Sequence, residues 1–184
     1  MTKQPLSILL RSNGMRLLTF LLLLLPIAHH GQDTSVKPYC TDKAFHKEVD
    51  GLLSHTVETI DVGLIKENPD AYLILDAREK EEFDVSHIPG AFWVGYNDFK
   101  ITRVPQDKRP VVIYCSVGYR SEKVGEIVKR HGHNKVYNLY GSIFEWANRG
   151  FPLCDKSDNS TQTVHTYNKA WSKWVDQNHI SVTW

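Results

Sequence analysis

The chain has 184 residues, enough for one domain with its own hydrophobic core and too few for two. Apolar residues make up 41% and charged residues 23%, as in ordinary soluble globular proteins, which excludes collagen, a disordered tail and a membrane protein with many spans. The net charge of +1 gives no basic excess for a nucleic-acid surface, so we expect no nucleic-acid partner.

Residues 1–31 predict an export signal. This stretch contains Lys3, Arg11 and Arg16, no acidic residue, and the apolar run Leu17–Ala28. A charged start followed by a short apolar run is typical of a signal peptide. The run would span about 18 Å as a helix, against about 30 Å for a bilayer core, so a membrane anchor is the less favoured alternative. We therefore expect a periplasmic or secreted protein with no stable membrane insertion after processing.

Residues 32–53 are expected to form a linker and an N-terminal helix. Thr41 or Asp42 can cap this helix, which would run to about His55. Helical spacing places four apolar side chains on one face of it: Phe45, Val49, Leu52 and Leu53.

Two uninterrupted apolar runs indicate strands that are buried on both faces. Tyr72–Leu75 ends in Asp76, and Val111–Tyr114 ends in Cys115. Such runs suit a parallel sheet. The predicted elements alternate along the chain as a strand at 56–60, helix at 61–68, strand at 72–75, helix at 79–85, strand at 111–114, helix at 121–130, strand at 135–139 and helix at 142–148. We therefore expect an α/β domain over residues 54–154, with a mostly parallel central sheet and helices on both faces.

Residues 155–184 are expected to form a C-terminal extension. Residues 155–163 are polar and predict a loop. Four residues with helical spacing then form an aromatic face, Tyr167, Trp171, Trp174 and Val175. This pattern predicts a helix that docks on the domain, and the alternative is an interface for a partner.

The segment Cys115–Ser121 is the candidate site, because it joins the end of a buried strand to the start of a helix. There a thiol faces loop amides and the positive end of the helix, and Gly118 lets successive amides converge. Arg120 adds a fixed positive charge. These surroundings favour the thiolate, the nucleophilic form of cysteine. A buried structural cysteine is the alternative.

Four segments resemble the rhodanese family in order and spacing. The first, Leu75–Glu79, resembles the family's Asp-x-Arg segment, and the second, Glu82–Ala91, resembles its Gly-His-Ile-Pro-Gly-Ala segment with Ser86 in place of the first Gly. The third is the loop Cys115–Ser121, and the fourth, Gly141–Pro152, resembles the closing signature of the family around Trp146. The resemblance covers about residues 54–154 and implies a three-layer rhodanese-like domain.

The resemblance implies a sulfurtransferase. Cys115 would take a sulfur from a small donor such as thiosulfate, form a persulfide, and pass the sulfur to a thiol or protein acceptor. The loop residues that would hold this sulfur are Ser116, Val117, Gly118, Tyr119 and Arg120. Asp76 and Arg78 are expected to support the loop, or to form an ordinary structural ion pair. No metal or organic cofactor is expected.

Two other functions remain open on the sequence. One is a persulfide carrier or protein-docking module with low turnover. The other is phosphatase or arsenate chemistry, which the spacing disfavours: four residues separate Cys115 from Arg120, whereas the related cell-cycle phosphatases have five, and a tetrahedral anion needs the wider loop.

Cys40 and Cys154 flank the domain. In an oxidising compartment this placement suggests a disulfide that ties the first helix to the end of the domain, with two unpaired thiols as the alternative. The histidines lack the spacing of a zinc site, so we expect no metal ligands among them. His87 is expected to fix the Ile-Pro-Gly turn, and Trp93 and Tyr96 to lie in the core.

Overall fold

The structure is a computed structural model that describes residues 37–184. Its helices are α1 (Lys43–Leu52), α2 (Val62–Glu67), α3 (Lys80–Val85), α4 (Tyr119–Arg130) and α5 (Ser142–Asn148), with short 3-10 helices at Pro69–Ala71, Ile101–Arg103 and Lys169–Trp174. Its strands are β1 (Glu58–Ile60), β2 (Leu73–Asp76), β3 (Phe92–Trp93), β4 (Val111–Tyr114), β5 (Val136–Leu139), β6 (Leu153–Cys154), β7 (Ser160–Thr161), β8 (Thr163–His165) and β9 (Ser181–Thr183).

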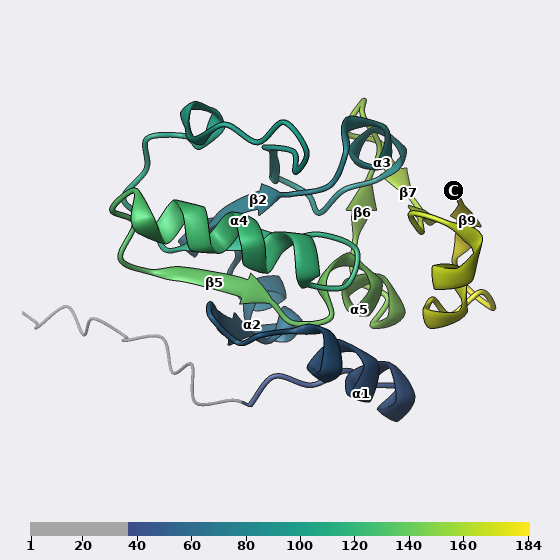
Figure 1. Cartoon of the computed structure of the whole chain (residues 1–184). Coiled ribbons are helices and arrows are strands. Elements are labelled where there is room, and N and C mark those ends of the chain that lie inside the picture. The colour runs from purple at the N-terminus through teal and green to yellow at the C-terminus, as the bar shows by residue number, and fades with distance from the viewer. Residues whose placement is uncertain (1–36) are drawn as a thin grey trace, which may run out of the picture. The chain divides into compact units, whose positions relative to one another are not determined.

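A five-stranded parallel sheet forms the centre of the domain, in the order β1-β5-β4-β2-β3 (Figure 1). The fully buried strands β2 and β4 are the two apolar runs of the sequence, and they pair with Leu73 opposite Val111. Two small sheets follow, the antiparallel pair β6-β7 and the parallel pair β8-β9. The predicted mostly parallel α/β architecture is confirmed.

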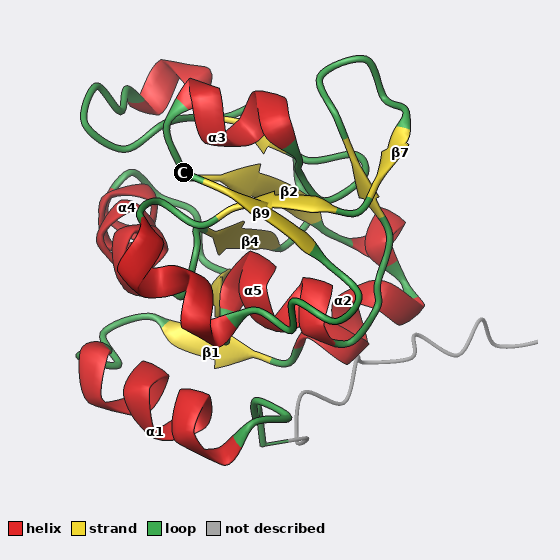
Figure 2. Cartoon of the chain, turned by 90° about the vertical axis from the view of Figure 1, so that its right-hand side faces the viewer, coloured by secondary structure: helices red, strands yellow, loops and turns green. Residues whose placement is uncertain are grey.

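Each face of the sheet has its own hydrophobic cluster. In β4, Val111 and Ile113 pack with Val124 and Val128 of α4, while the alternate residues of the strand contribute to the other cluster. That second cluster contains side chains from α1, α2 and α5, and Figure 2 shows α4 on one side of the sheet and α2 and α5 on the other. The period of two along a strand therefore distributes one continuous apolar run over two core layers.

The first two helices begin at the predicted caps. The Asp42 carboxylate accepts a hydrogen bond from the Phe45 amide at 2.6 Å, and the Asp61 carboxylate accepts one from the Gly63 amide at 2.7 Å. These bonds satisfy amides that have no partner within the first turn of a helix. The cap of α1 positions Phe45, which is fully buried.

The C-terminal extension docks on the domain as predicted, but the expected helix is largely wrong. Trp174 stacks on Phe45 with ring centroids 5.6 Å apart. The helical part is only the 3-10 helix Lys169–Trp174, because the Asn168 side chain caps it and Tyr167 before it has a φ of +66°. The predicted polar loop over 155–163 also contains strand β7, which pairs with β6.

The predicted export signal over residues 1–31 lies outside the described residues. Within the described part of the chain, no helix has the length and apolar character needed to cross a bilayer.

Candidate active site

The loop Cys115–Gly118 connects β4 to α4, as predicted, and the start of α5 holds it in place. The Cys115 amide donates to Ser142 Oγ at 3.2 Å, and the Cys115 carbonyl accepts from the Ile143 amide at 3.2 Å. The next carbonyl, that of Ser116, accepts from the Phe144 amide at 3.3 Å. The position of the Cys115 backbone is therefore fixed through both its amide and its carbonyl.

Gly118 gives the loop its tight curvature. Its φ is +126°, a conformation that residues with a side chain rarely adopt, and a Cβ at this position would lie 3.2 Å from Leu53 Cδ2. With this geometry the Gly118 amide points at Cys115 Sγ and donates to it at 3.2 Å. Gly118 thus supplies one of the inward-facing amides that the sequence predicts.

Two side chains complete the surroundings of the thiol. Ser121 Oγ lies 3.6 Å from Cys115 Sγ, and it also lies 2.7 Å from Asn138 Oδ1. The Asn138 amide group donates to the Gly118 carbonyl at 3.0 Å, which fixes its oxygen toward Ser121. Because the Ser121 hydroxyl has one proton, it can turn from Asn138 to the sulfur when Cys115 ionises.

The surroundings of Cys115 favour its thiolate form. The residue is only 1% exposed, and burial alone would raise its pKa. The positive charge of Arg120 and the hydrogen bonds from Ser121 and Gly118 outweigh burial and bring the pKa below the ordinary thiol value. In contrast, burial and nearby acidic groups raise the pKa of both Cys40 and Cys154. Only the loop cysteine therefore has the electrostatics of a nucleophile.

Glu82 of α3 holds Arg120 through a bidentate ion pair. Arg120 Nη1 donates to Glu82 Oε2 at 2.6 Å and Nη2 to Oε1 at 2.8 Å. Nη2 also donates to Ser116 Oγ at 2.9 Å, so the pair reaches back to the loop. Burial raises the pKa of Glu82, but the hydrogen bonds and charge of Arg120 outweigh it and leave that pKa lowered. The carboxylate that supports the loop is thus Glu82, which the sequence did not single out.

Asp76 and Arg78 form a buried ion pair of their own. Arg78 Nη2 donates to Asp76 Oδ2 at 2.7 Å and to the Ser86 carbonyl at 2.5 Å, and both side chains have no exposed area. The guanidinium also lies over the Tyr114 ring, 5.6 Å from its centroid. These contacts join β2 to the segment after α3, as in the structural alternative that the sequence left open.

Comparison with known proteins shows which domain and fold this region is similar to. Residues 61–149 match the model of the rhodanese-like domain. This match covers just under half of the chain, and the fold is rhodanese-like. The chain is 33% identical over 101 residues to a tRNA uridine(34) hydroxylase from Salmonella agona, a match that covers 50% of this chain and 28% of that protein. The crystal structure of a thiosulfate sulfurtransferase from Pseudomonas aeruginosa shares the fold, with a TM-score of 0.51 and 22% identity, over 59% of this chain and 22% of the other.

A cavity of about 250 Å³ opens beside Cys115. Its wall is mainly aromatic and apolar and includes Glu79, Tyr96, Asn97, Cys115, Ser116, Val117, Tyr119, Arg120, Tyr167 and Trp171. Tyr119 is 45% exposed at the border of this cavity. Tyr96 lines the cavity and packs, partly buried, against the edge of a core cluster. Trp93 is partly buried and belongs to neither cluster, which corrects the expectation that it lies in the core.

Two walls of this cavity come from outside the matched domain. Tyr167 and Trp171 belong to the C-terminal extension, and the Tyr167 ring lies 5.2 Å from the Arg120 guanidinium. The sequence predicted that these aromatic residues dock on the domain, but their regular spacing contained no signal that they border the site. Glu82 was similarly hidden, because it is one of several acidic residues in α3.

The predicted disulfide between Cys40 and Cys154 is not formed: both are free and buried, as is Cys115. Cys40 Sγ lies near Gly141 and Glu145, whereas Cys154 Sγ lies 3.7 Å from the His87 carbonyl oxygen. Each thiol is packed in its own environment, so sequence position at the two ends of the domain did not bring them together.

Proposed function

We propose that this chain transfers a sulfane sulfur atom through a persulfide on Cys115. The observation that supports it most is the lowered pKa of the buried Cys115, whose sulfur accepts a hydrogen bond from the Gly118 amide. A cysteine whose thiolate is favoured beside a mostly apolar cavity is a reactive nucleophile, and the donors that stabilise its charge can also stabilise a persulfide anion.

The reaction has two steps. In the first, the Cys115 thiolate attacks the outer sulfur of thiosulfate, the sulfur–sulfur bond of the donor breaks, and sulfite leaves with the electron pair. In the second, cyanide or an organic thiolate attacks the outer sulfur of the persulfide, and the Cys115 thiolate leaves. No net redox change occurs on the protein, and no metal or organic cofactor takes part in either step.

Arg120 acts in this proposal as a positioning residue. Both of its terminal nitrogens are engaged by Glu82, so the guanidinium is fixed before a donor arrives. Its charge lowers the pKa of Cys115 through space and draws an anionic donor toward the cavity. Glu82 and Ser116 keep that charge in place.

The same contacts argue against phosphate chemistry. A phosphatase of this architecture would need its arginine free to bind two oxygens of a tetrahedral anion. Here the bidentate partner of Arg120 is already Glu82, and the loop has four residues between Cys115 and Arg120. The site therefore suits a single sulfur atom better than an oxyanion.

The comparisons support the coarser part of the proposal, a rhodanese-like domain of the kind found in sulfurtransferases. The hydroxylases that match are much longer, since the chain spans 28% of their length. The shared segment is therefore the domain itself. We propose thiosulfate or a similar sulfane donor, and a thiol or protein acceptor, on the chemistry of the cavity.

Low turnover as a persulfide carrier is the second candidate. It is favoured by the 1% exposure of Cys115, because a thiol with so little exposed area exchanges donor and acceptor slowly. We also propose export to a periplasmic or extracellular location, on the charge and apolar pattern of residues 1–31.

Thiosulfate:cyanide transfer kinetics test the proposal. We expect thiocyanate formation with double-displacement kinetics, its loss in Cys115→Ser, and its retention in the matched thiol variant Cys40→Ser. Aryl phosphate hydrolysis by the same preparation should be negligible. A single equivalent of thiocyanate followed by very slow turnover would favour the carrier, and hydrolysis of the aryl phosphate without sulfur transfer would refute the assignment.

A further inference from the structure

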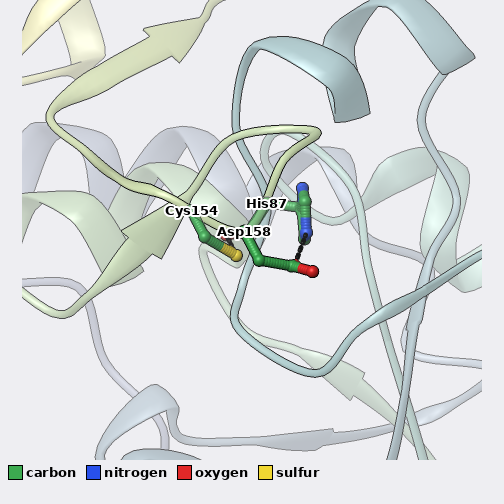
Figure 3. A group of neighbouring side chains, drawn as sticks. All are labelled: His87, Cys154 and Asp158. Carbon is green, nitrogen blue, oxygen red and sulfur yellow. Dashed lines mark hydrogen bonds and ion pairs between the residues drawn. The ribbon is translucent and has the colours of Figure 1, made fainter.

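Three side chains of metal-binding type converge away from the Cys115 cavity. His87, Cys154 and Asp158 each offer one ligand atom, and these atoms all lie within 4.8 Å of one another (Figure 3). None of the three lines the cavity around Cys115. The group lies where the segment after α3 meets β6 and the turn that follows β6.

Backbone pairing fixes two of the three ligands. His87 and Cys154 form an isolated antiparallel bridge, in which the His87 amide donates to the Cys154 carbonyl at 2.8 Å and the Cys154 amide donates back at 3.0 Å. Residues that are directly opposite in such a bridge direct their side chains to the same face. The imidazole and the thiol are therefore neighbours although 67 positions separate them in the sequence.

The imidazole has its metal-binding nitrogen free. His87 Nδ1 lies 3.0 Å from the Phe83 carbonyl oxygen, which can only accept, so Nδ1 carries the proton. Nε2 then presents its lone pair, and its neighbour is Asp158 Oδ1 at 3.8 Å, beyond hydrogen-bond distance. His87 is 4% exposed and its ring stacks on Phe83 at 3.8 Å. A backbone carbonyl that orients the far nitrogen is the arrangement found behind metal-bound histidines.

The third ligand sits on a preformed turn. The Asp155 carboxylate accepts from the Ser157 amide at 2.8 Å and from the Asn159 amide at 3.1 Å, which closes the connection between β6 and β7. Within this turn Asp158 has a φ of +60°, an uncommon conformation for a residue with a side chain. The turn directs the exposed Asp158 carboxylate toward the buried imidazole (Figure 3).

We propose that His87 Nε2, Cys154 Sγ and an Asp158 carboxylate oxygen bind Zn²⁺, with water at the fourth position. Zinc accepts this mixture of nitrogen, sulfur and oxygen at about 2.0–2.3 Å, which places a nitrogen and an oxygen ligand about 3.3–3.5 Å apart in a tetrahedron, and the sulfur about 3.5–3.7 Å from either of them. The observed separation of 3.8 Å between His87 Nε2 and Asp158 Oδ1 is slightly longer than this, and a small rotation of the exposed Asp158 side chain would close the difference. On binding, the Cys154 thiol releases its proton to solvent, while the imidazole is neutral and the carboxylate is ionised.

The soft thiolate and the borderline imidazole also select the type of metal. Ca²⁺ and Mg²⁺ bind through oxygen atoms, of which this group offers only one carboxylate, whereas thiolate and imidazole favour zinc. Bound zinc would tie the β6–β7 turn to the segment after α3. The sequence predicted no metal site because it was judged by ligand spacing, and this site depends on a bridge between distant segments.

Titration of the metal-free full chain with Zn²⁺ or Co²⁺ alone tests this proposal. The background is Cys115→Ser under reducing conditions, so that the reactive thiol does not contribute. We expect one equivalent of Co²⁺ to produce thiolate-to-cobalt charge-transfer absorption, which the His29-His30 pair of the sequence cannot give. Cys154→Ser should abolish that absorption, and Asp158→Asn, at an exposed turn position that Asn tolerates, should weaken Zn²⁺ binding at least tenfold.

Two matched variants complete the experiment. Cys40→Ala removes another buried thiol, and Asp70→Asn removes another exposed carboxylate, and both should bind Zn²⁺ as the Cys115→Ser chain does. Absence of the charge-transfer absorption, or equal Zn²⁺ affinity in Asp158→Asn and Asp70→Asn, would overturn the proposal. Thiosulfate:cyanide activity, measured with Cys115 present, should be the same in Asp158→Asn and the natural sequence, so the result is independent of the proposed function.

Discussion

At the scale of single residues, the site depends on a balance of charges around one sulfur atom. Burial opposes ionisation of Cys115, and Arg120, Ser121 and Gly118 overcome that opposition. The other two cysteines have burial and nearby carboxylates acting in the same direction, so both stay protonated near neutral pH. Three thiols of one chain therefore differ in reactivity because of their neighbours.

Alkylation by iodoacetamide near neutral pH should therefore modify Cys115 first. Removal of the positive charge in Arg120→Gln should raise the pKa of Cys115, which lowers the thiolate fraction and slows the reaction below the midpoint by about tenfold for each unit of pKa. Peptide mapping across a pH series measures both effects. Modification of Cys154 as fast as Cys115, or an unchanged midpoint in Arg120→Gln, would contradict this account.

Glu82→Gln should lower both stability and activity, because it leaves the Arg120 guanidinium without its carboxylate. We expect a loss of about 3 kcal/mol in the free energy of unfolding, at the lower end of the cost of removing one partner from a buried ion pair, because the Arg120 side chain keeps some exposure. The neighbouring exposed Glu81→Gln is the matched control. Urea unfolding and thiosulfate:cyanide rates measure the two effects, and equal behaviour of the two variants would exclude this role.

The same ion pair has a pH signature. The pKa of Glu82 is lower in the folded protein, so its contribution to stability is present above its unfolded pKa and is lost as the pH falls through its folded pKa. Unfolding midpoints below about pH 4 should fall more steeply for the natural sequence than for Glu82→Gln.

At the scale of elements, the sequence predicts the loop and the helix that carry the thiol, but it does not predict the residues that face them across the cavity. A strand that ends in Cys115 and a glycine before a helix are local signals. Glu82 and Tyr167 reach the site through tertiary packing of α3 and the C-terminal extension, so no local pattern reveals them. The expected C-terminal helix failed for a related reason, since the Asn168 cap and the pairing of β8 with β9 override helical spacing.

Tyr167 should restrict access to Cys115. Its ring is 57% exposed and lies over Arg120 at the edge of the cavity, so Tyr167→Ala should open the entrance with little cost in stability. Reaction of Cys115 with a bulky fluorescent maleimide should become severalfold faster, and reaction with the smaller iodoacetamide should change less than about twofold. Tyr39→Ala, another exposed tyrosine over an arginine, is the control. An unchanged ratio of the two rates would contradict a gating role.

At the scale of the whole molecule, the hydrophobic pattern determined the architecture well. The buried runs became adjacent parallel strands, and the caps Asp42 and Asp61 began the helices that were expected there. The pairing of distant cysteines was the main error, because sequence position says nothing about where two side chains point. The hydrophobic periodicity of each segment predicts which strands and helices form the layers of the domain. Which side chains of different layers touch one another can be seen only in the folded structure.

The extension should contribute to the stability of the entire domain. Trp174→Ala removes the stack on Phe45 at the base of α1, so we expect a loss of about 2 kcal/mol in the free energy of unfolding. Trp184→Ala, at a residue that is 55% exposed, should change it by less than about 0.5 kcal/mol. Denaturant unfolding measures both changes. Equal stability of the two variants would mean that the extension does not stabilise the domain.

Intact mass spectrometry of the purified chain after exposure to thiosulfate tests the central claim most directly. We predict a mass increase of one sulfur atom per chain, located on the Cys115 peptide, absent from Cys115→Ser and removed by cyanide. A chain that gains no sulfur from thiosulfate or from another sulfane donor, or that gains it equally in Cys115→Ser, would contradict persulfide chemistry at this loop.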